Sequence, residues 1–534
     1  MNHTKQIIFL VVIALIIAGG ALYSSGKSAP VAKEDLSRYA KAVERKEVSL
    51  KNGDTYDLAV DYVVKDFGGK AWKMLAYNGS IPGPTIRVTQ GDRITVKFTN
   101  KSDVRTLLHS HGVRMENTSD GSQLVQKEME PGESFTYTLT FPDPGVFWYH
   151  PHVREDMEQA LGLYANFIVS PKDPAEWNPV DGEEVLALGD VLVEDDHIAP
   201  FSKDFVTHAL MGRFGNTMIV NGKPAEEFHA KAGDVRRFFI TNVASVRTMS
   251  FRIPGASMKL VGADAGQYEK ETLVDAVTIA PSERAIVEVY FPKAGEYTME
   301  HKTPDTSYVL GKIIVGEGTG SDARLRAFMA LGGATDREKE AFAAARTYLD
   351  KTPDKQLRLA VNVDMNTIMS ASMGAGESSP GHTHNMAGMT GGTATTTPLV
   401  PLEWEDHMGA MNIYSTDKTV KWILRDEFTG KENMDINWTF VRGSLVKIRI
   451  TNDPSSMHPM QHPFHIHGNR FLILAVDGKP NTNMAWKDTV LVQAGQTVDI
   501  LVDMSNPGKW MAHCHIAEHL GSGMMFGYTV TSTN

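Results

Sequence analysis

The sequence contains a single cysteine among 534 residues, Cys514. One thiol excludes an internal disulfide framework, and its place near the C-terminus excludes a lipid-modified cysteine at the N-terminus. Positive charge is also in deficit, because 53 Lys and Arg stand against 64 Asp and Glu and give a net charge of -11. No basic block reverses this balance, so we expect no nucleic-acid partner.

The N-terminus has the features of an export signal, although no twin arginine is present. Lys5 precedes an apolar run over residues 7–18, and small residues follow at 19–21. This order is typical of a secretory signal, but the run extended to Tyr23 is nearly the roughly 20 residues that span a bilayer. We therefore expect 1–25 to be a signal peptide or an N-terminal membrane anchor, and the protein to be exported to the periplasm or the extracellular face.

Two patterns recur three times along the chain. The first begins with Gly, ends with Asn nine residues later and alternates apolar and polar side chains, as half-buried strands do; it covers 91–100, 233–242 and 443–452. The second pattern has three marker residues in each copy: the middle one comes thirteen residues after the first, and the last comes five residues later. The last marker is His150, Glu300 or His513. Short alternating strands between turn residues favour β-sandwiches. We predict an all-β fold of three copies of one module, at 48–172, 178–318 and 356–534.

The remaining segments depart from this repeat. Glu300 stands where the outer modules have histidine, so we expect the middle module to be a spacer without metal ligands. Segment 319–355 is rich in Ala, Arg, Glu and Leu and predicts a helical linker. Segment 365–411 is a Met-rich insert with seven methionines and three histidines, and its low-complexity core, 372–397, is interpreted as a loop.

Four His-x-His pairs lie in the outer modules: His109 and His111, His150 and His152, His465 and His467, His513 and His515. Residues two apart on a strand share a face, so each pair presents two imidazoles together. Imidazole suits copper, zinc and iron, and eight imidazoles are too many for one ion. A chance histidine couple explains one pair but not two in each outer module, so we expect a site for two or three ions with positions open to a small ligand.

Cys514 lies between two of these histidines. In an extended chain, His513 and His515 point to one side and Cys514 to the other, which suits an electron path between two metal sites. His462, His519 and Cys514, with Met524 or the adjacent Met525, match the two imidazoles, thiolate and weak thioether of a blue-copper site. Zinc accepts two histidines and a cysteine with water, but it leaves the eight paired imidazoles unexplained.

As a set, these motifs resemble the copper motifs of the multicopper oxidases, and the similarity runs from about residue 48 to 530. The resemblance implies three cupredoxin-like Greek-key β-sandwich domains and four coppers. The type 1 copper would take His462, Cys514, His519 and Met524, and the type 2 copper His109 and His465. The type 3 pair would take His111, His150, His152, His467, His513 and His515. The implied reaction is one-electron oxidation of a donor at the type 1 copper, coupled to reduction of dioxygen to water at the three-copper cluster.

Asp120, nine residues after His111, matches an acid that family members keep near the cluster, where it would hold or relay a proton. A plain turn over 119–121 is the alternative. The sequence also departs from the family pattern. Ser110 replaces the usual tryptophan, and Leu520 stands where some metal-oxidising relatives have an acid, which leaves their proton route unsupported here.

Methionine side chains near the predicted type 1 site indicate which electron donor the protein oxidises. An axial methionine implies a lower-potential type 1 copper, and methionine thioethers favour Cu(I). Met457, His458 and Met460 precede His462, and Met460 matches a substrate-copper ligand of copper-oxidising relatives, although His458 stands where they have aspartate. We expect a cuprous oxidase serving copper tolerance. A laccase-like phenol oxidase or ferroxidase is the alternative, and a copper-binding electron carrier without oxygen chemistry is an alternative of another class.

Overall fold

The computed structural model describes residues 35–67, 69–194, 197–374 and 399–532. The expected signal or anchor at 1–25 and the part of the insert at 375–398, with His382, His384, Met386 and Met389, lie outside these residues. Residues 35–39 belong to a separate unit and contain the 3-10 helix η1 (Leu36–Arg38); the unit from Ala40 onward contains every element below. In the described ranges, no helix is both long and apolar enough to cross a bilayer.

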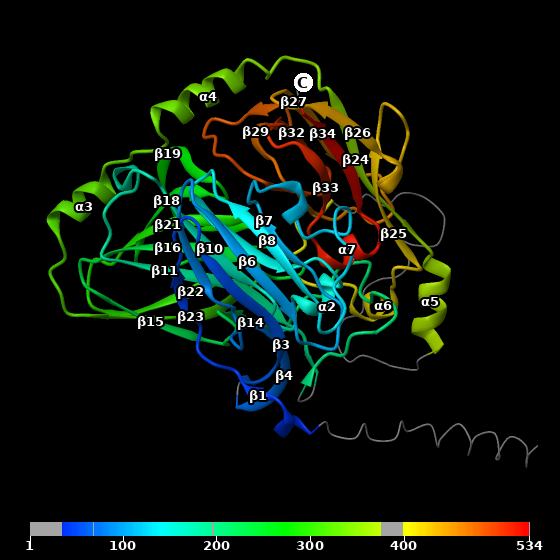
Figure 1. The fold of residues 1–534 in the computed structure, drawn as a ribbon, viewed down its shortest axis with the longest axis horizontal. Coiled ribbons are helices and arrows are strands. Elements are labelled where there is room, and N and C mark those ends of the chain that lie inside the picture. The colour runs from blue at the N-terminus through cyan, green and yellow to red at the C-terminus, as the bar shows by residue number, and fades with distance from the viewer. Residues whose placement is uncertain (1–34, 68, 195–196, 375–398, 533–534) are drawn as a thin grey trace, which may run out of the picture. The chain divides into compact units, whose positions relative to one another are not determined.

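In the part of the chain that the structure describes from Ala40 on, the strands form three pairs of sheets and a two-stranded ribbon, β12 with β13. We name the first, middle and third modules by their strands, β1 to β10, β11 to β23 and β24 to β34 (Figure 1). Apolar side chains from both sheets of each pair share one buried cluster, as in a β-sandwich. The predicted all-β fold is confirmed.

The first module pairs a sheet of order β1-β3-β6-β8, with β4 on β3, with a sheet of order β2-β5-β10-β9-β7. Its strands are β1 (Ala40–Lys41), β2 (Glu47–Ser49), β3 (Thr55–Phe67), β4 (Lys70–Tyr77), β5 (Thr85–Thr89), β6 (Arg93–Asn100), β7 (Leu108–His111), β8 (Ser134–Thr140), β9 (Gly145–Pro151) and β10 (Ala165–Ser170). Its short helices are η2 (Asn117–Ser119) and α2 (Glu155–Glu158).

The middle module pairs a sheet of order β14-β11-β16-β21-β18-β19 with one of order β15-β23-β22-β17-β20. Its elements are η3 (Pro174–Glu176), β11 (Gly182–Val191), β12 (Val193–Glu194), β13 (His197–Ile198), β14 (Thr217–Val220), β15 (Glu226–Lys231), β16 (Val235–Asn242), β17 (Met249–Arg252), β18 (Ser257–Ala263), β19 (Gly266–Val274), β20 (Val277–Ile279), β21 (Arg284–Tyr290), β22 (Gly295–Lys302) and β23 (Ser307–Gly316).

The third module pairs a sheet of order β25-β24-β27-β32-β29-β30 with one of order β26-β34-β33-β28-β31. Its strands are β24 (Lys355–Val363), β25 (Val420–Asp426), β26 (Asn437–Val441), β27 (Leu445–Asn452), β28 (His462–Ile466), β29 (Arg470–Val476), β30 (Lys479–Pro480), β31 (Thr489–Val492), β32 (Thr497–Asp503), β33 (Gly508–Cys514) and β34 (Met525–Thr531). Its helices are α5 (Met365–Gly374), α6 (Gly409–Tyr414), η5 (Asn433–Asp435) and α7 (Ala517–Gly521).

The recurring sequence pattern is a recurring piece of backbone. The strands β6, β16 and β27 occupy corresponding places, each between a parallel and an antiparallel neighbour. The glycine that begins each pattern has a positive φ, +94° at Gly91, +87° at Gly233 and +82° at Gly443. Glycine adopts this left-handed conformation without the steric penalty that a Cβ brings. The repeat therefore marks turns whose backbone conformation favours glycine.

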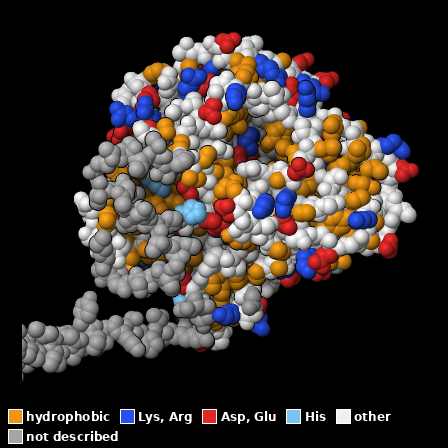
Figure 2. Space-filling view, turned by 180° about the vertical axis from the view of Figure 1, so that it is seen from behind, with side chains coloured by type: hydrophobic (Ala, Val, Ile, Leu, Met, Phe, Trp, Pro, Cys, Tyr) orange, Lys and Arg blue, Asp and Glu red, His pale blue; other side chains and the backbone are white. Residues whose placement is uncertain are grey.

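The predicted helical linker consists of two helices, α3 (Asp322–Met329) and α4 (Asp336–Arg346). Thr335 and Glu338 form a reciprocal capping box at the start of α4, which satisfies backbone donors that the first turn leaves free. The helix α3 packs on β16 and β21, whereas α4 contacts β19 of the middle module and β29 of the third (Figure 1). On the face drawn in Figure 2, acidic and basic side chains are interspersed.

Candidate metal centre

Strand pairing brings the four His-x-His pairs together in two matching arrangements. The strands β7 and β9 are antiparallel and set His109 opposite His150. The strands β28 and β33 do the same in the third module and set His465 opposite His513. Rings in contact have centroids from 3.7 to 6.2 Å apart. The histidine cluster is the set His109, His111, His150, His152, His465, His467, His513 and His515, all of them buried.

Hydrogen bonds fix one nitrogen of most of these rings. Nδ1 donates to a carbonyl oxygen in His109 (to Asp120, 2.6 Å), His150 (to Pro151, 2.7 Å), His465 (to Asp488, 2.9 Å) and His513 (to Cys514, 2.9 Å). Nδ1 of His152 donates to the side-chain oxygen of Gln123 at 3.1 Å. His111 is reversed, since its Nε2 donates to Asp488 Oδ1 at 3.0 Å.

The second nitrogen of these rings faces the other histidines. Buried nitrogens without a partner among the described residues are Nε2 of His109, His150, His152, His465 and His515, and Nδ1 of His111. Nε2 of His467 lies 3.0 Å from Nε2 of His513. Burying so many unpaired acceptors is costly unless a cation binds them. One held nitrogen and one free nitrogen per ring is the usual arrangement of a metal-binding histidine, so the cluster fits copper.

Burial also keeps these rings neutral. It lowers the pKa of His109, His467 and His513 to about 3, and for His109 and His513 the neighbouring imidazoles contribute to this lowering. Burial and the rings around them hold the pKa of His150 and His152 well below the ordinary value. A neutral imidazole is the form that binds a metal, so the site is ready for ions at neutral pH.

A second site, the thiolate site, consists of His462, Cys514, His519 and Met524. Sγ of Cys514 lies 3.5 Å from Nδ1 of His462 and 3.7 Å from Nδ1 of His519, and these two nitrogens are 3.3 Å apart. The indole of Trp422 stacks on His519 with ring centroids 3.9 Å apart and meets His462 at an angle. Burial raises the pKa of the Cys514 thiol, so a bound cation is what would hold it as a thiolate.

Met524 and Met525 differ in burial. Met524 is fully buried in the core that contains Cys514, and its carbonyl oxygen accepts a hydrogen bond from the backbone N–H of Cys514 at 3.1 Å. Met525 opposes His513 in the pairing of β33 with β34 and is half-buried. This difference favours Met524 over Met525 as the thioether beside the sulfur.

The two sites share one stretch of chain. Strand β33 is extended through Cys514, as the sequence predicts, and its side chains alternate. Cys514 turns toward His462 and His519, while the rings of His513 and His515 lie 5.4 and 5.8 Å from that of His465 in the cluster. A few covalent bonds therefore join the thiolate site to the cluster.

Asp120 lies against two cluster rings. Both of its carboxylate oxygens are 3.0 Å from Nδ1 of His467, and its carbonyl accepts from His109. Burial raises the pKa of this carboxyl. Asp120 directly follows the single turn η2, and Gly121 after it has φ +74°, so the turn that the sequence also suggested is what aims the carboxylate.

The three residues predicted to bind substrate copper occupy different environments. Met457 is 61% exposed, whereas Met460 is fully buried in the core. His458 is half-buried, and its Nε2 lies 2.9 Å from Sδ of Met211, a buried residue of the middle module. No sequence pattern singled out Met211, because it lies in a loop far from the histidine motifs.

Sequence reasoning also missed acids around the cluster. Asp488 directly precedes β31 and touches His111 with its side chain and His465 with its carbonyl. Glu155, three residues after His152, lies 3.4 Å from Nδ1 of that ring. A cavity of about 520 Å³ reaches His152 and is lined by Glu155 and Leu520 among others. The only available signal was the spacing of Glu155 from His152.

Comparison with known proteins agrees with this geometry. Models of multicopper oxidase domains match residues 60–174, 183–312 and 405–534. The multicopper oxidase MmcO of Mycobacterium tuberculosis is 28% identical over 494 residues, which cover 86% of this chain and 83% of that protein. Copper resistance protein A of Escherichia coli is 23% identical and covers 88% of this chain and 92% of its own.

The fold is also that of solved multicopper oxidases. A multicopper oxidase from Campylobacter jejuni, described as a metallo-oxidase, superposes with a TM-score of 0.67 at 22% identity, covering 93% of this chain and 97% of that one. The three cupredoxin-like modules, the buried histidine cluster and the thiolate beside it agree with the matches over residues 60–174, 183–312 and 405–534. The chain belongs to the multicopper oxidase family, copper-binding oxidoreductases that use dioxygen.

Proposed function

We propose that this oxidase takes electrons from Cu(I) at the thiolate site and uses them to reduce dioxygen to water at the histidine cluster, in the service of copper tolerance. The observation that carries the proposal is the contact of His458 Nε2 with Met211 Sδ, 2.9 Å, beside the thiolate site. Thioether is a soft ligand that selects Cu(I), and imidazole also binds copper, so this pair of donors suits Cu(I) better than Fe(II).

The proposal assigns four coppers to the two donor sets. The thiolate site would hold the type 1 ion with His462, Cys514, His519 and Met524 as ligands. In the cluster, His109 and His465 would hold the type 2 ion, and His111, His150, His152, His467, His513 and His515 the type 3 pair. When bound, copper supplies reversible one-electron chemistry at the first site and the binding and reduction of dioxygen at the second.

The chain's own residues would organise this chemistry. Cys514 provides the covalent path between the sites, because its neighbours His513 and His515 belong to the cluster. Trp422 is buried and stacks on His519, which restricts the position of that ring. Asp120 accepts from His467 and orients that ring. We also propose, as the sequence predicts, that Asp120 holds or relays a proton during oxygen reduction.

Several observations support Cu(I) as the donor. Met408 and Met411, at the end of the Met-rich insert, pack half-buried against the core that contains the thiolate site. The ring of Trp422 lies near both the contact of His458 with Met211 and the thiolate site. It is 6.5 Å from the ring of His458 and 4.9 Å from that of His462. One relative is named for copper resistance, and one solved structure is described as a metallo-oxidase.

The test is a comparison of steady-state rates with Cu(I), Fe(II) and a phenol. We expect Cu(I) to give the largest kcat/KM. The substitution Met211→Leu should lower kcat/KM for Cu(I) about tenfold, equivalent to ~1.4 kcal/mol of binding, and leave the phenol rate unchanged. Met218→Leu is the matched control, because Met218 is a buried methionine of the same module in another core cluster. Deletion of residues 375–398 should lower the Cu(I) rate selectively.

Three outcomes would contradict the proposal. If Met211→Leu lowers Cu(I) and phenol turnover equally, Met211 contributes to core packing and does not bind Cu(I). A phenol or Fe(II) as the fastest donor, with Cu(I) turnover unchanged by the deletion, would favour the laccase-like or ferroxidase alternative. If copper-loaded protein takes up no oxygen with any donor, the protein is a copper-binding electron carrier without oxygen chemistry.

We also propose that the protein acts outside the cytoplasm, with 1–25 as a cleaved signal or a retained membrane anchor. The order of Lys5, the apolar run 7–18 and the small residues at 19–21 supports it. Fractionation of cells expressing the full chain, with N-terminal sequencing of the recovered protein, tests it. Cytoplasmic protein that retains Met1 would contradict it.

A further inference from the structure

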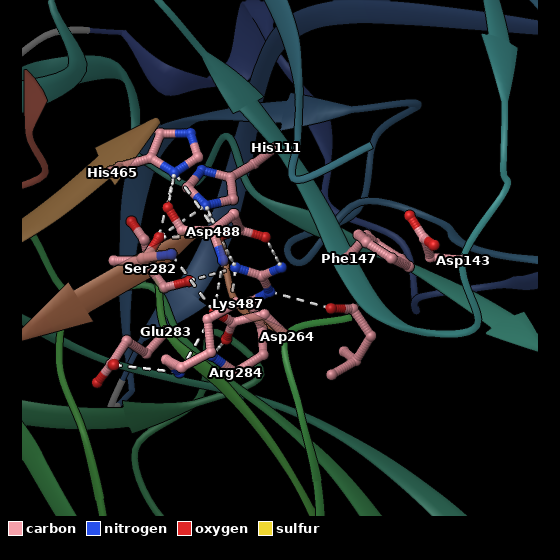
Figure 3. Close-up of polar contacts among 12 residues, drawn as sticks. His111, Asp143, Phe147, Asp264, Ser282, Glu283, Arg284, His465, Lys487 and Asp488 are labelled. Atoms are coloured by element: carbon pink, nitrogen blue, oxygen red, sulfur yellow. Dashed lines mark hydrogen bonds and ion pairs between the residues drawn. The ribbon is translucent and has the colours of Figure 1, made fainter. Parts of the chain in front are cut away.

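The middle module has no cluster histidine, yet a fully buried arginine of this module, Arg284 at the start of β21, reaches the cluster. Its guanidinium forms a bidentate ion pair with Asp488 of the third module, Nη1 to Oδ1 at 2.6 Å and Nη2 to Oδ2 at 2.5 Å (Figure 3). Its Nε donates to the carbonyl oxygen of Val146 in the first module at 3.0 Å. Arg284 therefore contacts all three modules at once.

Asp488, the partner of Arg284, also accepts hydrogen bonds from two cluster rings. Its Oδ1 accepts from Nε2 of His111 at 3.0 Å, and its carbonyl oxygen accepts from Nδ1 of His465 at 2.9 Å (Figure 3). The hydroxyl of Thr489 donates to Asp488 Oδ1 at 2.9 Å and lies 3.2 Å from both ring nitrogens. The same carboxylate thus decides which nitrogen of His111 is left free, and that nitrogen is Nδ1.

A second acid of the middle module fixes the backbone at this point. Oδ2 of Asp264 accepts from the backbone N–H of Asp488 at 3.2 Å, and its Oδ1 accepts from that of Arg284 at 2.9 Å. The Nζ of Lys487 lies 3.3 Å from Asp264 and 3.2 Å from Glu283. Each charge in this group has an opposite charge beside it, which a buried polar group needs to keep one geometry.

Gly112 shows how closely the pair is enclosed. A Cβ at this position would lie 2.3 Å from Asp488 Oδ2 and 2.7 Å from Arg284 Nη2. Gly112 directly follows His111, so the backbone of the ligand strand rests on the ion pair. The ring of Phe147 covers the guanidinium from the first module at 5.9 Å. Little room is left for Asp488 to take another position.

We propose that Arg284, acting through Asp488, is a positioning residue for the copper cluster: it fixes the orientation of His111 and His465, and so makes the histidine-free module part of the oxygen-reducing site. The inference rests on the cluster of the proposed function but not on the identity of the electron donor. Partners that orient metal-binding histidines typically contribute 10- to 100-fold to metal affinity or activity.

The test compares Arg284→Lys with Arg247→Lys in the full chain. Lysine keeps the charge and loses the bidentate fork. Arg247 is the matched control, because it is an equally buried arginine of the middle module, pairs with Asp190 at 2.7 Å and has no contact with a cluster histidine among the described residues. The readouts are copper bound per chain, the near-ultraviolet absorption of the type 3 pair, the electron paramagnetic resonance of the type 2 ion and the visible thiolate band.

We expect Arg284→Lys to weaken copper binding at the cluster 10- to 100-fold and to change the type 2 and type 3 signals. The thiolate band should persist, and kcat should fall while KM for the donor stays constant. Arg247→Lys should leave all of these signals unchanged. Thr489→Val, which removes the hydroxyl but no charge, should give a smaller change of the same kind and serves if Arg284→Lys fails to fold.

Three results are decisive. Cluster signals that are the same in Arg284→Lys, Thr489→Val and Arg247→Lys would overturn the proposal. Loss of the thiolate band together with the cluster signals, in parallel with a lower melting temperature, would show a structural role only. A wild-type protein that lacks the type 2 and type 3 signals would instead reject the cluster itself, whichever donor is used.

Discussion

The carbonyl oxygen of Cys514 accepts a hydrogen bond from Nδ1 of His513 at 2.9 Å, so neighbouring residues of the two sites are joined by a covalent and a hydrogen-bonded path. The sulfur of the same cysteine lies 3.5 Å from His462 on the opposite side of the strand. The alternation of a single β-strand therefore places one donor in each site. Sites joined in this way allow electrons to arrive singly at one place and to be used together at another.

The thioether of Met524 should tune the thiolate site. We expect Met524→Leu to raise the reduction potential of the type 1 copper, because a weak axial sulfur ligand that stabilises the oxidised ion is lost. Redox titration of the visible band measures this potential. Met525→Leu is the control, since Met525 is half-buried and opposes His513. A potential that shifts in Met525→Leu and stays constant in Met524→Leu would exchange the two assignments.

Asp120 should matter for the cluster and not for the thiolate site. Its carboxylate accepts from His467, and an amide in Asp120→Asn is a weaker acceptor, so we expect a 10- to 100-fold fall in kcat or in cluster copper affinity. The visible thiolate band should be unchanged. Asp143→Asn is the control, because Asp143 is another buried acid of the first module and pairs with Arg114 and Arg470. An equal loss in both variants would point to folding.

Gly468 directly follows the cluster residue His467 and lies against the ring of Trp510. It has φ +67°, and a Cβ would lie 2.3 Å from the ring of Trp510. We expect Gly468→Ala to lower the free energy of unfolding by about 2–4 kcal/mol, from overpacking and from strain at positive φ. Gly443→Ala has a similar φ of +82° with nothing within 4 Å, so it should cost only about 1 kcal/mol. Denaturant unfolding of both variants measures the difference, and equal losses would contradict it.

Acid should destabilise the copper-free protein. The pKa of His109, His462, His467 and His513 falls to about 3 in the fold because the rings are buried, against about 6.5 in an unfolded chain. The unfolded state then binds more protons between these values. Stability is full above about pH 6.5 and is lost progressively as the pH falls toward 3.

Guanidinium unfolding of the copper-free protein at pH 7.5 and pH 5 measures this effect, and the midpoint should be lower at pH 5. Copper-loaded protein should show a smaller change, because bound copper competes with protons for the same nitrogens. A midpoint that is independent of pH in the copper-free protein would contradict the burial of these rings.

The sequence predicts much of the site because strand periodicity and metal chemistry are both local. The spacing of His109 and His111 fixes their shared face, and the alternation at Cys514 fixes the two-sided strand. Strand β33 and the turn at Asp120 follow from such local patterns. Multiple copies of the same signal in the outer modules also made a chance explanation untenable.

Contacts between modules could not be predicted from the sequence. Met211 reaches His458, and Arg284 reaches Asp488, across separations of 247 and 204 residues. Met211 lies outside both recurring patterns, and Arg284 falls within the second but is not one of its marker residues. Both contacts depend on how one sandwich packs on the next. The middle module, expected to be a spacer without metal ligands, contributes none of the cluster histidines. Its side chains nevertheless contact His458, near the thiolate site, and Asp488, beside the cluster.

The most direct test of the central claim is the optical spectrum of copper-loaded protein and of its Cys514→Ser variant, with oxygen uptake measured alongside. We predict an intense visible thiolate-to-copper band that disappears on substitution, together with the loss of oxygen uptake, while the near-ultraviolet absorption of the cluster remains. A wild-type spectrum without the visible band, or a Cys514→Ser variant that keeps wild-type oxygen uptake, would contradict it.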